Sequence, residues 1–594
     1  MERQRSLSRF LKPETIAAGV AFILTVGLFS FGITDGHLHL DDWGYTYGCG
    51  FVNSGLSGDN IIRSFIDLGN GGIWMPFTYI TYMADMTFWG GGWRVHHAVN
   101  AVLHGLNAVL VFWFLMRMAN LLAKGERRAV VWASLAGALA WSLHPMRAEA
   151  VVWVASRKEE LWAFFALSAG LCWIAFIERG GGWRYVATVG LFVLACLSKP
   201  TAVCFPLLAL AIQSAIFGRA RFRLRHYLPM LLVSFVVGVI AVHSQTNPTG
   251  FDRIDVSDTS FAWRILNASV SLGLYLVHAV APVGVRMDYR AVFGGWPLDG
   301  GLGLSVLAAV AVGVSVLLLL PRCAAWRRSL LFACAWFLFS VMPVLGLLGA
   351  TGDKAYADRY TYVPAVAISL LIAVGLAGLC GRLAKRMWAA AILAALAAEA
   401  ALALPVIRSF ESDYPAYSRV LRYDPEHWRA LRVVGCEYCA RQNRMDEGIA
   451  MLKLSLGLRP SQTTADRLAY SLACRGADGD FAEVRRLGGA AAADASCDKG
   501  GMMLDALAIA AMRDGDDASA ARHFAAALAA PRRTHSNIHS MLNLGLSLAN
   551  TGRRTEALKV LQKLTGVSNE KVRRRAVEAI KRLSDGERTR FGGE

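Results

Sequence analysis

Two adjacent carboxylates, Asp41 and Asp42, follow directly after the first apolar segment of this sequence. An acid pair near a membrane surface can bind a divalent cation, or one acid can take the proton of an acceptor hydroxyl. The alternative is a solvated loop or the N-cap of a surface helix. Their place after a predicted membrane crossing favours chemistry. The residues leave open which acid acts and whether a metal takes part.

A second charged stretch, 144–160, lies between two apolar runs at 129–143 and 161–177. It carries ionisable side chains of both signs, which a simple connector between membrane helices does not need. A charge costs about 2.5–3.5 kcal/mol at the centre of a spanning helix, so charges this close to the hydrocarbon suggest use. We therefore expect an active-site segment at the membrane surface.

Four side chains of this stretch have candidate roles. His144 and Glu149 are predicted to act in catalysis or to position an acceptor. Arg157 and Lys158 are predicted to hold a phosphate, because both groups bind phosphate through charge-assisted hydrogen bonds. The alternative for this pair is that both side chains reach toward the membrane edge without a ligand.

A stripe of polar residues marks the predicted membrane helix at 94–118. Its later members follow the first at +3, +7 and +10, which places all four on one helix face. Such a stripe either lines a cavity or forms hydrogen bonds with a neighbouring helix. The members are His97, Asn100, His104 and Asn107.

Charge recurs at two later positions. Lys199 interrupts apolar sequence with no acid nearby, which indicates either anion binding or a lysine that reaches out from a helix end. Asp358 and Arg359 belong to a polar segment between two later predicted spans, on the same side of the membrane as the acid pair.

The composition places most of the chain in a membrane. Of 594 residues, 55% are hydrophobic and only 18% are charged, and the mean hydropathy is +0.39. Repeated apolar runs of about 20 residues predict an all-α bundle of spanning helices. The net charge of +18 does not require nucleic acid, because Lys and Arg concentrate in short loops, as cytoplasmic loops do.

We predict eleven crossings, beginning with an uncleaved anchor whose N-terminus is cytoplasmic. The basic loops alternate so that 35–93, the first outer loop, and 144–160 lie outside. The apolar run 263–284 contains polar residues and is expected to be re-entrant or interfacial. If it crosses instead, there are twelve crossings and a cytoplasmic tail. The predicted spans are 14–34, 94–118, 128–143, 160–178, 184–198, 200–217, 227–243, 301–320, 329–348, 362–381 and 388–407.

The composition divides the chain into a transmembrane domain at 1–410 and an Ala-rich, charged domain at 411–594. In the second domain, small residues recur at equivalent places, Gly448, Ala520 and Ala557, spaced by 72 and 37 residues. This pattern resembles the tetratricopeptide repeat, a helix pair of about 34 residues. Three to four such repeats form a short α-solenoid, which is a partner-binding architecture.

The predicted repeat domain contains four cysteines. Aligned to the repeat, Cys436 and Cys439 take packing positions of a first helix, although their spacing also fits a redox or zinc pair. Core packing, a disulfide and a metal site are all left open for the set. Its members are Cys436, Cys439, Cys474 and Cys497.

Several short motifs occur in a fixed order, and together they are specific although no single one would suffice. The combination resembles the TMTC family of transmembrane and tetratricopeptide-repeat proteins, which are O-mannosyltransferase-like enzymes with the GT-C fold. The resemblance runs from about 35 to 565. The motifs are Asp41-Asp42, Trp74-x-Pro76-x-Thr78, His96-His97-x-x-Asn100-x-x-x-His104, Leu143-His144-Pro145-x-Arg147-x-Glu149, Trp153-x-x-x-Arg157-Lys158, Leu197-Ser198-Lys199-Pro200 and Ala357-Asp358-Arg359-Tyr360-Thr361-Tyr362-x-Pro364.

The resemblance implies a glycosyltransferase that uses a polyprenyl-phosphate-linked sugar and acts outside the cytoplasm. In such enzymes an acid of the first outer loop sits at the catalytic centre, and this role corresponds to Asp41 or Asp42. Two departures exist: Glu159 stands where Asp commonly follows the Arg-Lys pair, and the repeat array is short. The family's His-Pro and Arg-Lys segment corresponds to His144, Glu149, Arg157 and Lys158.

We therefore expect an integral-membrane glycosyltransferase of GT-C type that transfers a sugar to a hydroxyl of a protein or glycan acceptor selected by the repeats. The Ala/Arg/Gly-rich composition favours a bacterial inner membrane, with the active site and repeats facing the periplasm. The alternatives are a scaffold that docks envelope proteins, an oligosaccharide transferase for surface polysaccharide, and a transporter. The residues assigned to the donor are Arg157, Lys158, Lys199, Asp358, Arg359, His97, Asn100 and His104.

Overall fold

The computed structural model of this chain is helical throughout the part that it describes. No strand occurs there, so the all-α prediction is confirmed for these residues. The described residues are 12–39, 41–68, 72–122, 126–218, 222–246, 261–289, 326–347, 356–379, 385–493, 501–530 and 537–586.

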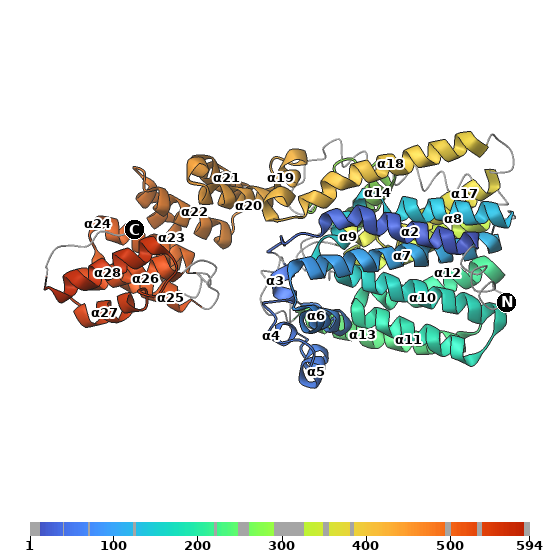
Figure 1. Ribbon diagram of the computed structural model, residues 1–594, viewed down its shortest axis with the longest axis horizontal. Coiled ribbons are helices and arrows are strands. Elements are labelled where there is room, and N and C mark those ends of the chain that lie inside the picture. The colour runs from blue at the N-terminus through green and yellow to red at the C-terminus, as the bar shows by residue number, and fades with distance from the viewer. Residues whose placement is uncertain are drawn as a thin grey trace, which may run out of the picture. The chain divides into compact units, whose positions relative to one another are not determined.

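The chain forms two compact units, Met1–Val420 and Leu421–Glu594. The boundary between them falls ten residues after the domain boundary that the composition predicts at 410/411. The first unit is a bundle of apolar helices that lie roughly along one direction (Figure 1). Its main helices are α2 (Pro13–Phe29), α7 (Trp93–Leu122), α8 (Arg127–Ser142), α10 (Arg157–Arg179), α11 (Gly182–Ser198), α12 (Phe205–Phe217), α13 (Leu228–Thr246), α14 (Phe261–Val280), α16 (Arg327–Val341), α17 (Val366–Leu379) and α18 (Lys385–Ser409).

Seven helical stretches among the described residues are long and apolar enough to cross a membrane. Their length and composition indicate a membrane protein, because about 20 apolar helical residues span a bilayer. The seven are Pro13–Gly32, Trp93–Leu122, Val154–Arg179, Pro200–Phe217, Leu228–Gln245, Arg327–Val344 and Ala389–Ser409.

The remaining predicted spans correspond to other features. An eighth candidate is a pair of helices, Arg127–Ser142 and Pro145–Val151, bent by 57° at their junction. Three shorter apolar helices, Gly182–Ser198, Arg264–Val280 and Val366–Gly378, fall at or near predicted membrane elements. The span at 301–320 lies outside the described residues. Eleven crossings and a re-entrant 263–284 therefore stay predictions.

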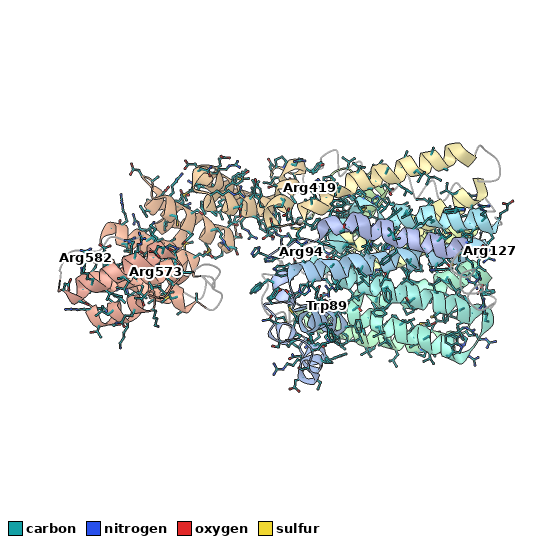
Figure 2. The ribbon with its side chains drawn as sticks, viewed as in Figure 1. Trp89, Arg94, Arg127, Arg419, Arg573 and Arg582 are labelled. Carbon is teal, nitrogen blue, oxygen red and sulfur yellow. The ribbon has the colours of Figure 1, made fainter. Side chains whose placement is uncertain are left out.

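The two predicted outer segments meet at one end of the bundle, which we call the loop end. Asp42 Oδ1 accepts a hydrogen bond of 2.7 Å from the backbone amide of Ala155, which joins the first loop to 144–160. At the opposite end, Arg127 pairs with Glu14 at 2.8 Å. Figure 2 labels Trp89 and Arg94 near the loop end and Arg127 near the other end. The helices of the first loop are α3 (Asp42–Tyr45), α4 (Gly50–Asn53), α5 (Gly58–Ile66) and α6 (Pro76–Trp89).

The stretch 144–160 folds into buried helical turns. Pro145 stands at the first position of η2 (Pro145–Arg147), where its fixed φ suits a helix start and its missing N–H costs nothing. Two further short helices follow, α9 (Ala148–Val151) and η3 (Val154–Ser156), before α10 begins. Every residue from 144 to 160 is buried. The charges therefore face protein partners, and the stretch is no solvated connector.

The second unit is an array of helices in which each packs against the next. Gly448 shows why the small positions recur, since a Cβ there would lie 2.6 Å from the carbonyl oxygen of Gly435 on the preceding helix. The equivalent Ala520 and Ala557 are fully buried. The helices are α20 (Trp428–Ala440), α21 (Met445–Leu458), α22 (Gln462–Arg475), α23 (Asp480–Ala493), α24 (Met502–Asp514), α25 (Asp517–Ala529), α26 (Asn537–Asn550), α27 (Arg554–Gln562) and α28 (Glu570–Ser584).

Two cysteines of this unit take packing roles. Cys436 and Cys439 pack against a core that includes Leu452 and Leu472. Both are free thiols, as is Cys474, so no disulfide links these three. Cys497 lies outside the described residues.

Candidate functional site

The two adjacent acids of the first loop have different environments in the structure. Asp42 is 1% exposed, and its Oδ2 accepts a hydrogen bond from the backbone amide of Leu38 at 2.9 Å. Its Oδ1 is occupied by the Ala155 amide. Burial raises the pKa of Asp42 to about 7, although the two amides act in the opposite direction. Asp42 therefore acts as a structural link between two segments of the loop end.

Asp41 has a different environment. It stands at the N-cap of α3, but its side chain makes no capping hydrogen bond. The residue is partly exposed, and within the described residues no hydrogen bond or ion pair holds its carboxylate. Asp41 interacts electrostatically with Lys158 and Arg359. Of the two acids, Asp41 is the one that is free to meet a ligand.

Two cations, Lys158 and Arg359, interact with Asp41, and together with Lys199 we call them the cation cluster. Lys158 interacts electrostatically with each of the other two. Its Nζ donates one hydrogen bond, at 2.8 Å, to the carbonyl oxygen of Ala155, and lies 4.6 Å from the centre of the Tyr45 ring. No carboxylate of the described residues forms an ion pair with Lys158. An ammonium group has three donors, so this cation can still bind an anion.

The other two cations each hold a carboxylate. Lys199, where α11 ends, forms an ion pair with Glu159 of α10. Arg359 of η8 (Asp358–Thr361) forms an ion pair with Glu149, which also accepts a hydrogen bond of 2.9 Å from the Arg359 amide. Both cations lie about 5 Å from the centre of the Tyr360 ring, at 5.0 Å for Lys199 and 4.7 Å for Arg359. The cluster is thereby fixed by side chains from four separate segments.

Arg157, which the sequence pairs with Lys158, points into the bundle. It is 0% exposed and forms an ion pair with Asp85 at 2.7 Å. Its Nε donates to Asn100 at 2.7 Å, and its guanidinium lies over the Tyr82 ring. Asp85 is also bonded to His96 at 2.7 Å. These contacts use Arg157 to hold α6, α7 and α10 together, so the structure does not bring it to the cation cluster.

The polar stripe of α7 binds neighbouring segments. His97 contacts the carbonyl oxygen of Gly36 at 3.0 Å, and Asn100 donates to that of Val151 at 3.1 Å. His104 contacts the Tyr362 hydroxyl at 2.7 Å. Of the two alternatives for the stripe, these contacts match interhelical hydrogen bonding. Asn107 completes the stripe with a hydrogen bond to the carbonyl oxygen of Glu160.

His144 and Asp358 belong to a neighbouring network. His144 accepts a hydrogen bond from the Met146 amide at 3.3 Å, as the cap of η2. Asp358 is fully buried, and its two oxygens accept hydrogen bonds of 2.8 Å from Tyr289 and Tyr356. Asp358 therefore holds η8, which presents Arg359, and both predicted site residues have supporting contacts here.

The acid pair offers one free ligand for a cation. Among the described residues, no three His, Cys, Asp or Glu side chains come close enough together to hold a metal ion. Both oxygens of Asp42 already serve backbone amides, so Asp41 alone of the pair is free. No step proposed below uses a metal.

Sequence reasoning did not assign a role to several residues of the site. Glu159 departs from the family motif, and in the structure it pairs with Lys199. Asp85 pairs with Arg157, 72 positions later in the chain, and no local pattern indicates this contact. Tyr360 lies next to Lys199 and is part of the motif that contains Asp358 and Arg359, whereas Tyr45 lies next to Lys158 and outside the motifs.

No protein-family model matches this sequence, and a search of the curated proteins returns no significant match.

Proposed function

We propose that this chain is an integral-membrane glycosyltransferase. It moves a sugar from a polyprenyl-phosphate-linked donor to a hydroxyl of a protein or glycan acceptor on the extracytoplasmic face. One observation carries the proposal: the partner-free acid Asp41 lies beside Lys158 and Arg359 at one end of a membrane bundle. Such transfer needs a base for the acceptor and a stabilised phosphate leaving group, and this arrangement offers both.

In the proposed reaction, Asp41 takes the proton of the acceptor hydroxyl as its oxygen attacks the anomeric carbon of the donor sugar. The new carbon–oxygen bond forms while the bond from that carbon to the phosphate oxygen breaks. The electron pair leaves with the polyprenyl phosphate, whose charge the cation cluster stabilises. The proton is released from Asp41 afterwards, so atoms and charge balance.

The three cations divide the work in this proposal. Lys158 binds the phosphate directly, because no carboxylate of the described residues neutralises it. Arg359 and Lys199 add positive potential, and their partners Glu149 and Glu159 orient them. This reassigns Glu149 from catalysis to positioning. Arg157 holds the bundle together in this proposal and does not touch the donor.

We further propose a GT-C-type fold with a tetratricopeptide-repeat solenoid, as in the TMTC family. The order of the motifs supports this assignment. So does the run of successive short helices from α20 to α28, with small residues at Gly448, Ala520 and Ala557. The repeats would select the acceptor. The composition supports a bacterial inner membrane, with the loop end facing the periplasm.

Replacement of Asp41 tests the base. We expect Asp41→Asn to lower transfer from a polyprenyl-phosphate sugar by about 10²–10⁴-fold, the usual contribution of a general base. The assay follows release of polyprenyl phosphate by the full chain in nanodiscs, with a membrane-protein extract as acceptor. Asp59→Asn, an exposed acid of the same loop, is the matched control and should transfer normally. Unchanged transfer by Asp41→Asn overturns the mechanism and favours the scaffold.

Replacement of Lys158 tests the phosphate site. We expect Lys158→Met to weaken donor binding at least tenfold, because the free ammonium group is lost while the fold retains its ion pairs. Donor binding is measured by displacement of a fluorescent polyprenyl phosphate. Lys453→Met in the repeat unit, an exposed lysine paired with Glu483, is the control. Equal donor binding by both variants would show that Lys158 does not bind the donor phosphate.

A further inference from the structure

Helix α5 of the first loop is amphipathic, but its apolar side is exposed and its polar side is buried. Its apolar side chains Ile62, Phe65 and Ile66 are 58%, 39% and 69% exposed, whereas Asn60 and Ser64 are buried. The exposed three follow the spacing i, i+3, i+4 and therefore share one helix side, which we call the α5 face. A helix of a protein that meets only water turns such a stripe inward. The α5 face is therefore a candidate binding surface.

Polar contacts hold α5 in this orientation. Asn60 Nδ2 donates to the carbonyl oxygen of Gly55 at 2.7 Å, and Ser57 caps the helix by accepting from the Asn60 amide at 3.1 Å. The indole N–H of Trp74 donates to the carbonyl oxygen of Phe65 at 3.0 Å. Rotating α5 to bury its apolar side would break these bonds, so the outward face is built into the loop.

The position of α5 indicates what covers this face. The helix packs on α6, and α6 packs on the apolar helix α11. Helix α6 ends with Phe88 and Trp89, which are 66% and 62% exposed, and the spanning helix α7 begins at Trp93. Figure 1 shows α5 beside α6, extending sideways from the loop end of the bundle, and Figure 2 labels Trp89 there. Exposed aromatic residues at the end of a span are typical of the membrane–water interface.

We propose that the α5 face, together with Phe88 and Trp89, lies in the headgroup-to-acyl boundary of the bilayer leaflet at the loop end. An amphipathic helix binds there by burying its apolar side below the headgroups. Continuity with the ends of α6 and α7 favours lipid as the occupant over a second protein.

This anchor has a consequence that rests on the proposed function. The loop that carries α5 also carries Asp41 at the start of α3, and α4, the next helix after α3 in the chain, packs on both α5 and α6. Seating α5 in the leaflet holds the loop at the depth where a lipid-linked donor presents its phosphate. The anchor thus positions Asp41 for a membrane-borne substrate.

Site-specific photo-crosslinking of the full chain in phosphatidylethanolamine/phosphatidylglycerol nanodiscs tests the anchor. A benzophenone amino acid is placed at position 62 or 66, and at the exposed position 453 of the repeat unit as the control. We expect phospholipid adducts, detected by mass spectrometry, at least fivefold more often at 62 and 66 than at 453. Equal adduct yields, or adducts with a protein in place of lipid when membrane extract is added, overturn the proposal.

A triple variant separates this anchor from the catalytic proposal. Ile62→Ser/Phe65→Ser/Ile66→Ser should unfold in detergent at the wild-type temperature, since these side chains are exposed, while adducts from position 89 fall at least threefold in nanodiscs. Asn53→Ser, at an exposed position of α4 in the same loop, is the matched control and should keep them. Lipid crosslinking does not depend on sugar transfer, so the two proposals can fail separately. If the lipid adducts form as expected but Asp41→Asn transfers sugar normally, the anchor is retained and the enzyme proposal is rejected. Unchanged adducts at position 89 in the triple variant reject the common anchor.

Discussion

The Asp42 carboxylate bonds to two backbone amides, which belong to Leu38 and Ala155. In Asp42→Asn, the side-chain NH₂ group replaces one carboxylate oxygen. One of the two backbone amides then faces this NH₂ group and is left buried without an acceptor. We expect a loss of about 1–3 kcal/mol in the free energy of unfolding. Thermal unfolding of the full chain in detergent measures it. Asp41→Asn, next to it, should unfold like the wild type, and an equal loss in both variants would contradict the division between the two acids.

The same carboxyl predicts a pH dependence of stability. Burial raises the pKa of Asp42 to about 7, above that of the same carboxyl in the unfolded chain. The fold thus favours the protonated form, so the contribution is complete below about pH 4 and is lost as the pH rises through about 7. The side chain at position 42 can ionise in the wild type but not in Asp42→Asn. The melting temperature of the wild type should therefore exceed that of Asp42→Asn by less as the pH rises from 5 to 8. An advantage that grows with pH would mean that the amides outweigh burial.

Arg157 and Asp85 form a buried pair whose loss is expected to unfold the bundle. Removing one member leaves the other charge uncompensated, which costs about 3–5 kcal/mol. We expect this loss in Arg157→Met, and a double Asp85→Asn/Arg157→Met variant that is less destabilised than the sum of the singles. Melting temperatures in detergent measure the cycle. Lys158→Met, the neighbouring residue on α10, should melt normally. An Arg157→Met chain that melts normally but fails to bind donor would return Arg157 to the phosphate site.

The contrast between Arg157 and Lys158 shows what the sequence could and could not predict about the site. The motifs predicted a larger site that included Asp41 or Asp42 together with Arg157, Lys158, Lys199 and Arg359. In the structure, Lys158 interacts electrostatically with Asp41, Lys199 and Arg359. Adjacent residues of a helix point about 100° apart, so only one of the Arg-Lys pair can face the loop end. Which one does so depends on Asp85, a partner distant in the sequence.

At the scale of elements, the crossing of α20 and α21 depends on two glycines. A Cβ on Gly448 would lie 2.6 Å from the carbonyl oxygen of Gly435 and 2.7 Å from the Cys439 amide nitrogen, which are backbone atoms that cannot move aside. We expect Gly448→Val to cost about 1–3 kcal/mol through overpacking. Gly457→Ala, on the same helix with open space around it, should be neutral or slightly stabilising. Unfolding monitored by circular dichroism compares the two, and equal stability of both variants would contradict a close crossing.

Elements were predictable where an apolar run is uninterrupted, and less so at 144–160. Charges of both signs predicted an active-site segment at the membrane surface, and the structure adds that the whole stretch is buried. Its charges find partners on other elements, as Glu149 does with Arg359 and Glu159 with Lys199. Such pairs join residues 210 and 40 positions apart, so local patterns carry no trace of them.

At the scale of the whole molecule, the distribution of charge agrees with the placement of the site. The basic start of α8, with Arg127 paired to Glu14, lies at the end opposite the first loop. Basic loops face the cytoplasm in most membrane proteins, so the loop end and Asp41 are expected on the other side. A lipid-linked sugar presented in that leaflet would meet the cation cluster without crossing the bilayer.

Truncation tests how the first unit ends and what the repeats do. Beyond residue 410, Asp413 contacts the His39 ring at 3.0 Å and Arg419 donates to the carbonyl oxygen of Val285 at 2.7 Å. A chain cut after Phe410 loses both contacts, each worth about 0.5–1.5 kcal/mol, so it should melt below one cut after Tyr423, the end of α19 (Asp413–Tyr423). If the repeats select the acceptor, as proposed, the longer form should bind a fluorescent polyprenyl phosphate normally yet transfer poorly to protein. Full transfer by that form would confine acceptor recognition to the membrane unit, and equal melting of the two forms would place the boundary at 410.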